Sequence, residues 1–206
     1  MSGLKIYTDI GWVLVGGGGG GIALTVTDGI VTVANVSQIT LRDGTVVNSG
    51  GGAVTIGMDY ILVRDEKPAG TSGGTMTAGA WHIRDINTEV SDLGGHCSIA
   101  SNQITLAAGT YECRIIVPGY QISRHKAILY NVTDSLTQLV GSNHFAGSGI
   151  AAGNDVNIIG RFTISASKIF EIRHRCEATQ ATYGFGVEGN FGEIEIYTIA
   201  EFWKVR

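Results

Sequence analysis

The five histidines of this sequence are the residues best suited to acid–base or metal chemistry, but their spacing supports neither. They are His82, His96, His125, His144 and His174, and no two of them form an HxH or HxxxH pair. The segment HIRDINTEVSD joins His82 to Asp85, Glu89 and Asp92, which could supply nitrogen and oxygen ligands to a metal. A solvent-exposed acidic loop explains the same residues and is the interpretation that we favour, so we predict no metal site.

Nucleophilic catalysis finds equally little support. Cys97 follows His96 directly, and adjacent residues of a strand point to opposite faces of a sheet, so the two side chains would not pair. The segment GSGIAAG around Ser148 does not match the GxSxG pattern of a hydrolase nucleophile. Glu193 and Glu195 could form a carboxylate pair on one strand face, but so do ordinary solvent-facing residues. We therefore predict a protein that is not an enzyme and has no cofactor.

Six consecutive glycines at positions 16–21 raise the question of a phosphate-binding loop. Such a loop needs a Lys-Ser or Lys-Thr pair and a following helix, whereas IALTVTDG after the glycines is typical of a strand. A dinucleotide fold would need a βαβ unit, which is also missing. Two interpretations remain open: a flexible tether, spanning about 14 Å for six glycines, or an extended glycine strand packed against another backbone.

The composition restricts the partners. Hydrophobic residues make up 44% of the 206 positions and charged residues 16%, with a net charge of −4, so neither nucleic acid nor an anionic membrane surface is favoured. No apolar run reaches the roughly 18 residues of a membrane span, and we predict no membrane insertion. Three cysteines are an odd, low number that favours reduced thiols made in a cytoplasm. A Cys97–Cys113 or Cys113–Cys176 bridge is the alternative.

The elements that would position these residues are strands. Residues 1–21 form an N-terminal arm with the glycine run, and 22–65 a Val/Thr-rich β segment whose strands are too short to be stable alone. Three intertwined copies would bury its apolar faces, which favours a homotrimer. The predicted trimer-interface residues are Val26, Val31, Val33, Ile39, Leu41 and Val46. The predicted partner-docking residues of the arm are Tyr7, Ile10, Trp12 and Leu14.

The rest of the chain divides into a linker at 66–80 and a β domain at 81–206. Turn residues separate short strands at roughly 8–12-residue intervals, which is typical of a sandwich or jelly roll. In KIFEIRHRC, alternation predicts that the inward face carries Phe170, Ile172, His174 and Cys176. In TYECRIIV, one face carries Tyr111, Cys113, Ile115 and Val117. The predicted fold class is all-β: a jelly-roll sandwich preceded by a short intertwined trimeric β segment and an arm.

The segment NQITLAAGTYECRIIVPG resembles the C1q/TNF-like jelly rolls found on bacteriophage fibres. The matching pattern, I-x-L-x-A/P-G-x-Y, is formed by Ile104, Leu106, Ala108, Gly109 and Tyr111. The upstream Val/Thr-rich segment is similar to the repeats by which fibre and head-decoration proteins intertwine three chains. This resemblance implies a homotrimeric protein of the virion surface, assembled in the host cytoplasm.

Three functions follow as hypotheses. The first is a capsid decoration or cement protein that docks by its arm onto the major capsid protein or another virion protein. The second is the receptor-binding tip of a tail fibre or spike. Its Gly141–Asp155 loop would recognise a host surface glycan, with candidate residues Asn143, His144, Phe145 and Asn154. The third is a cell-surface or polysaccharide-active enzyme, which no motif favours.

Overall fold

The computed structural model describes residues 59–205 with their side chains and, in the preceding chain, the backbone of six short strands. The chain divides into two units, Met1–Arg42 and Asp43–Arg206. The six strands pair antiparallel in twos: β1 (Leu4–Thr8) with β2 (Gly11–Val15), β3 (Val26–Thr27) with β4 (Thr32–Val33), and β5 (Thr45–Asn48) with β6 (Val54–Gly57). No helix occurs among the described residues.

Several residues predicted for docking and trimerisation lie on these strands. Tyr7 on β1 is opposite Trp12 on β2, where Leu14 also lies, and Val26 on β3 is opposite Val33 on β4. Val46 lies on β5, opposite Ile56. Outside the described residues are Ile10, Val31, Ile39, Leu41 and the glycine run 16–21. The docking and trimer-interface roles of all these residues stay predictions.

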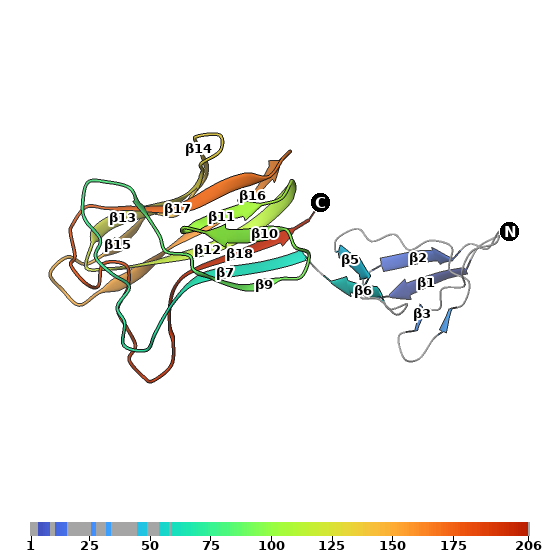
Figure 1. Ribbon diagram of the computed structural model, residues 1–206, viewed down its shortest axis with the longest axis horizontal. Coiled ribbons are helices and arrows are strands. Elements are labelled where there is room, and N and C mark those ends of the chain that lie inside the picture. The colour runs from blue at the N-terminus through green and yellow to red at the C-terminus, as the bar shows by residue number, and fades with distance from the viewer. Residues whose placement is uncertain are drawn as a thin grey trace. The chain divides into compact units, whose positions relative to one another are not determined.

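Five strands form the first sheet of the β domain, in the order β16-β12-β18-β7-β9 (Figure 1). Their bounds are β16 Gly153–Ile164, β12 Gly109–Tyr120, β18 Glu195–Lys204, β7 Asp59–Lys67 and β9 Thr88–Asp92. All neighbours are antiparallel. The longest pairing joins β12 to β16 over the full length of both strands, which gives the sheet a continuous central ladder.

The second sheet has the order β10-β11-β17-β13-β14, with two short strands attached to it. The bounds are β10 Cys97–Ala100, β11 Gln103–Leu106, β17 Lys168–Cys176, β13 Ser123–Asn131 and β14 Leu136–Val140. The short strand β15 (His144–Ala146) pairs with β13, and β8 (His82–Ile83) pairs with β17. Sequence reasoning had treated β15 as part of a loop; its pairing with β13 fixes the position of His144.

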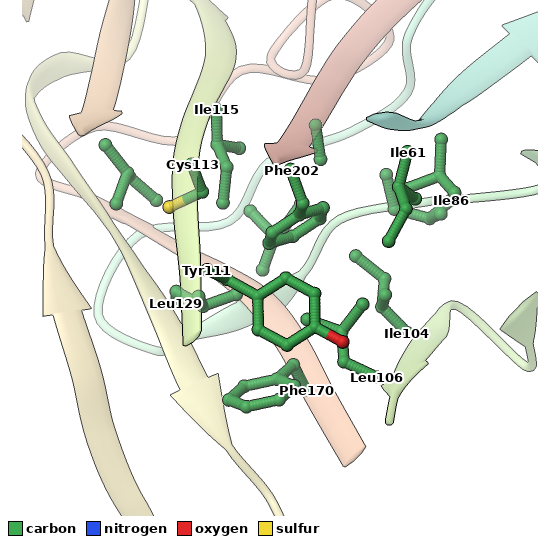
Figure 2. Packing of buried hydrophobic residues seen from close by; sticks show 14 of the residues in the cluster. Ile61, Ile86, Ile104, Leu106, Tyr111, Cys113, Ile115, Leu129, Phe170 and Phe202 are labelled. Carbon is green, nitrogen blue, oxygen red and sulfur yellow. The ribbon is translucent and has the colours of Figure 1, made fainter. Parts of the chain in front are cut away.

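The main apolar core lies between the two sheets, and Figure 2 shows part of it; a smaller cluster is formed by Met76, Ile122, Ala146 and Cys176. The first sheet contributes Ile61, Tyr111, Ile115 and Phe202, and the second contributes Ile104, Leu106, Leu129 and Phe170; all eight are fully buried. Burying a side chain of this size contributes about 1.5–3 kcal/mol. The ring of Tyr111 lies 5.7 Å from that of Phe162, and its hydroxyl donates to the carbonyl of Ala107 at 2.8 Å, which satisfies its polar end.

The period-2 patterns predicted the inward faces of both long central strands correctly. Phe170, Ile172, His174 and Cys176 of β17 are buried, as are Tyr111, Cys113, Ile115 and Val117 of β12. Two antiparallel sheets packed around one core, with all-β content, confirm the jelly-roll sandwich. The three cysteines are free thiols, two of them buried.

The β domain begins earlier than the sequence suggested. We placed 59–65 at the end of the trimerising segment and 66–80 in a linker, but β7 pairs with β18 along its length, and its Ile61 and Val63 are core residues. Met76 is fully buried and forms a β-bridge with Gln180. The alternation of DYILVRD predicts a strand but not which sheet it joins, because that depends on its pairing with the distant β18.

Two glycines allow the 66–80 and 177–194 segments to pack closely. A Cβ on Gly73 would lie 2.7 Å from the backbone carbon of Phe185, and the Gly73 amide donates to the carbonyl of Gly186 at 2.9 Å. Gly186 has a φ of +137°, which side-chain-bearing residues rarely adopt. The two segments therefore form one unit beside the sheets.

Candidate functional site

A broad, open depression of about 750 Å³ lies where β13, β15 and β17 meet the segment that follows Met76. It is lined by Ala78, Gly79, Arg124, His125, Asn143, His144, Arg175, Cys176 and Glu177. Two of the four predicted receptor-loop residues, Asn143 and His144, are therefore brought together here. Phe145, with 58% of its surface exposed, and Asn154 are not among the lining residues.

The rim of the depression is charged. Arg124 binds Glu177 through two hydrogen bonds, Nε to Oε2 at 2.9 Å and Nη2 to Oε1 at 2.6 Å. Ser123 donates to the same carboxylate at 2.6 Å. The hydrogen bonds from Arg124 and Ser123 lower the pKa of Glu177 to about 2, so it is ionised at all physiological pH values. Arg175, which is opposite Lys126 in the β13–β17 register, is exposed.

Below the depression, two buried histidines touch. His125 Nδ1 and His174 Nε2 are 2.9 Å apart, and the side chains are 4% and 0% exposed. One ring must therefore donate to the other, and the remaining nitrogens, His125 Nε2 and His174 Nδ1, have no partner among the described residues. Burial lowers the pKa of His125 to about 4 and that of His174 well below 6.5, and the charge of Arg84 acts in the same direction. Both rings are neutral at pH 7.

Arg84 is buried inside the domain and forms no ion pair with a carboxylate of residues 59–205. Its guanidinium donates to Thr198 Oγ1 at 2.8 Å, to the carbonyl of Phe185 at 2.8 Å and to the carbonyl of Pro118 at 3.3 Å. The Phe185 ring lies 4.3 Å from the guanidinium carbon. Burial lowers the pKa of Arg84 to about 10, so the side chain is a permanent cation that joins the two sheets to the 177–194 segment.

The histidine pair was missed because it has no local signature. His125 and His174 are 49 positions apart and meet through the β13–β17 pairing. The sequence did contain one signal, the alternation of inward and outward residues along each strand. His174 shares the inward face of Phe170 and Ile172, and His125 shares that of Ala127 and Leu129. Neither histidine activates a thiol, since burial raises the pKa of the neighbouring Cys176, whose thiol donates to the carbonyl of Ala178.

The residues of HIRDINTEVSD that were considered above as metal ligands do not come together in the structure. His82 Nε2 lies 2.8 Å from the carbonyl of Thr77, and Asp85 binds Lys67 at 2.8 Å. Asp92 accepts hydrogen bonds from the amides of His96 and Cys97, at 3.0 and 2.7 Å. Among residues 59–205, no group of three His, Cys, Asp or Glu side chains has a geometry suited to a metal ion.

Cys97 and Glu195, considered above as a nucleophile and as one of a carboxylate pair, have contacts that support the fold instead. Burial raises the pKa of the Cys97 thiol to about 12, and the ring of His96 lies instead against the carboxylate of Asp59, at 3.3 Å. Glu195 is not the solvent-facing residue that we expected, being only 8% exposed. It accepts hydrogen bonds from the amides of Gly70, Gly189 and Asn190 at 2.8–3.0 Å, which lower its pKa and fix the two long loops to each other.

The outer side of the first sheet forms a second surface of interest, which we call the open sheet face. Its apolar side chains are Leu62, Ile116, Ile159, Ile196, Ile199 and Trp203. Ile159 is 70% and Ile196 40% exposed, and Trp203 lies 5.5 Å from the Tyr60 ring. A shallow hollow of about 390 Å³ runs over it between Trp203 and the Arg114 and Arg161 side chains. The described residues include no helix able to cross a membrane.

No protein-family profile matches the sequence, and no curated protein sequence is significantly similar to it. Solved structures with similar coordinates include murine APRIL at pH 5.0, at 10% identity over 72% of this chain and 99% of that chain, with a TM-score of 0.48. The globular domain of zebrafish complement 1qA has 12% identity over 72% and 98%, with a TM-score of 0.45. PRD1 vertex protein P5 has 15% identity over 73% and 99%, with a TM-score of 0.41. The jelly-roll assignment rests on the sheet order and core described above.

Proposed function

We propose that this chain is a non-catalytic structural protein of a bacteriophage particle, a homotrimer that decorates the capsid. Its N-terminal arm would dock on the major capsid protein or another virion protein, and its jelly roll would project from the surface. The phage assignment is supported by the resemblance of residues 102–119 and of the Val/Thr-rich segment. Self-association is supported by one structural observation, the open sheet face.

The composition of the open sheet face suits a contact with other copies of the chain. Burying apolar surface contributes about 25 cal/mol per Å², and Ile159 alone leaves 70% of its surface to be covered. Charges of both signs surround the apolar residues: Arg114 is opposite Glu201 in the strand register, and Glu112 lies 3.6 Å from Arg161. A surface with balanced charges can pack against other copies of the chain around a threefold axis without net repulsion.

Light scattering of the full chain tests the trimer. We expect a mass of about 65 kDa, three times the 21.7 kDa of one chain. Ile159→Glu should reduce that mass, because it places a charge in the apolar contact. Ile150→Glu is the matched control, since Ile150 is 64% exposed but lies outside this face. A monomeric wild-type chain, or equal effects of the two variants, would contradict the proposed interface.

Deletion of residues 1–21 tests the docking arm separately. The shortened protein should keep its oligomeric mass and lose binding to particles that lack the decoration protein. Full occupancy of such particles by the shortened protein would show that the arm is not the docking element.

The depression favours a second candidate function, recognition of a host surface glycan at the tip of a fibre or spike. It gathers Asn143 and His144 with two arginines in one open hollow. Fluorescently labelled protein should then bind host cells, and the double variant Asn143→Ala/His144→Ala should bind less. Absence of cell binding by the wild-type protein would exclude this second function.

A further inference from the structure

The depression contains donors that the protein itself does not use. No ion pair or hydrogen bond joins the side chains of Arg175, Asn143 or His144 to any other residue in the part of the chain that the structure describes. They come from two parts of the chain that are distant in sequence, Arg175 from β17 and the consecutive Asn143 and His144 from the point where β15 begins. Convergence of polar groups from separate elements in one hollow is typical of a ligand site.

The charge of the depression is opposite to that of the chain. Its lining holds two arginines and one glutamate, a balance of +1, and Lys126 beside Arg175 adds a further positive charge. The chain as a whole carries −4. A local positive region on an acidic protein attracts anions specifically to that place.

The two arginines also have a suitable geometry. The amide of Glu177 donates to the carbonyl of Arg124, and Lys126 is opposite Arg175, so the two arginines are diagonal neighbours on one face of the β13–β17 pair. Such neighbours lie about 7–8 Å apart, within the combined reach of two guanidinium groups. Glu177 holds the Arg124 guanidinium in place, whereas that of Arg175 is free to form a bidentate contact with an oxyanion.

We propose that the depression binds a saccharide that carries an anionic group, with Arg175 as the principal contact to the anion. Asn143 and His144 then form hydrogen bonds with the hydroxyl groups of the saccharide, since an amide and an imidazole can both donate and accept them. The inference rests on the second candidate function, glycan recognition, and adds the chemical class of the glycan. Carboxylate and phosphate groups share the chemistry that an arginine recognises, and the experiment separates them.

Calorimetric titration of the full chain with small saccharides tests the proposal. The probes are trigalacturonate and its fully methyl-esterified form, and glucose 6-phosphate and glucose. We expect at least one anionic probe to bind and its neutral counterpart to bind at least about tenfold more weakly. The anionic probe that binds more tightly identifies the group as carboxylate or phosphate.

Arg175→Gln should weaken binding of the anionic probe at least about tenfold, as expected from the loss of a charged hydrogen bond. Lys168→Gln is the control: it removes the same charge from β17, at a side chain that binds Asp134 at 2.6 Å and lines neither the depression nor the open sheet face. Circular dichroism should show that both variants are folded. Equal weakening by the two variants would mean that only the general charge of the protein matters, which overturns the inference.

The neutral probes distinguish failure of this inference from failure of glycan recognition itself. Tight binding of glucose or the methyl ester, lost in Asn143→Ala/His144→Ala, would keep the recognition function and refute the anionic class. If no probe binds but the wild-type protein binds host cells, with Arg175→Gln binding as well as wild type, the inference fails and recognition stands. If the wild-type protein binds neither the saccharide probes nor host cells, both the inference and the glycan-recognition function fail.

Discussion

The buried histidine pair should make the β domain lose stability in mild acid. His125 and His174 are neutral in the folded protein, whereas in the unfolded chain each takes up a proton near pH 6.5. Between that pH and about 4, the unfolded chain binds more protons than the folded one, so the free energy of unfolding falls as the pH falls. Above pH 6.5 both states are neutral at these positions, and the pair contributes no pH dependence.

The size of the effect follows from the lowered pKa of His125. A change from 6.5 to about 4 corresponds to about 3 kcal/mol. The ring borders the open depression, where water screens part of the cost, so we expect a loss of about 2 kcal/mol by pH 4. His174 acts in the same direction, because its burial disfavours the charged form. The fixed positive charge of Arg84 also repels a proton on this ring, which touches that of His125.

Urea unfolding between pH 7 and pH 4.5, at one fixed protein concentration, measures this loss. The double variant His125→Gln/His174→Gln should show a flatter dependence on pH, whatever its stability at pH 7. His96→Gln is the control: its ring contacts both Asp59 and Lys204 at 3.3 Å and lies outside the buried pair, so this variant should change the slope less than the double variant does. The reasoning is refuted if the double variant and the wild type lose the same free energy between pH 7 and pH 4.5.

Three further predictions concern stability and reactivity. Phe170→Ala should lower the free energy of unfolding by about 3–5 kcal/mol, measured by urea unfolding, because it opens a cavity between the sheets; a loss below 1 kcal/mol would mean that the core closes around the gap. Gly73→Ala should lower the free energy of unfolding by about 1–3 kcal/mol in the same assay, since its Cβ would meet the backbone of Phe185 at 2.7 Å. Gly79→Ala is the control: its Cβ would meet no atom within 4 Å, so it tests only the effect of the φ of +92°. Cys113, whose pKa is raised to about 12 by burial, should resist a thiol reagent at pH 8 in the folded protein and react in urea; rapid labelling of the folded chain at this residue, read by peptide mass spectrometry, would contradict its burial.

Local patterns were enough to predict the long strands and the inward faces of β12 and β17, but not β9 or β15, which we expected to lie in loops. The alternation in KIFEIRHRC places Phe170 and His174 on one side whichever strands are neighbours, because the period of a strand is a backbone property. For the same reason, the alternation within β7 does not identify the sheet that this strand joins. Its residues alternate equally well in either unit, and only its pairing with β18, more than a hundred positions away, decides where it belongs.

The candidate site was only half predictable for a related reason. Asn143 and His144 stood out in a glycine-rich segment with turn residues, but the arginines that accompany them come from β13 and β17. Which residues meet across a sheet depends on register, and a single sequence carries little information on register between distant strands. Glu195 shows the converse: its charge suggested exposure, and three amides from two loops compensate for its burial.

The pairing of β7 with β18 places the first and last strands of the β domain side by side, with Asp59 directly opposite Lys204. A force that pulls Asp59 and Lys204 apart therefore opens the β7–β18 ladder one bond at a time from that end, instead of loading it in shear. The same neighbourhood means that a short peptide could join Lys204 to Asp59 in a circular permutant, with new ends cut elsewhere. A reporter fused after Lys204 would emerge beside the entry of the chain, and an exposed loop such as the one around Ile150 would be the better place for display at a distance from it.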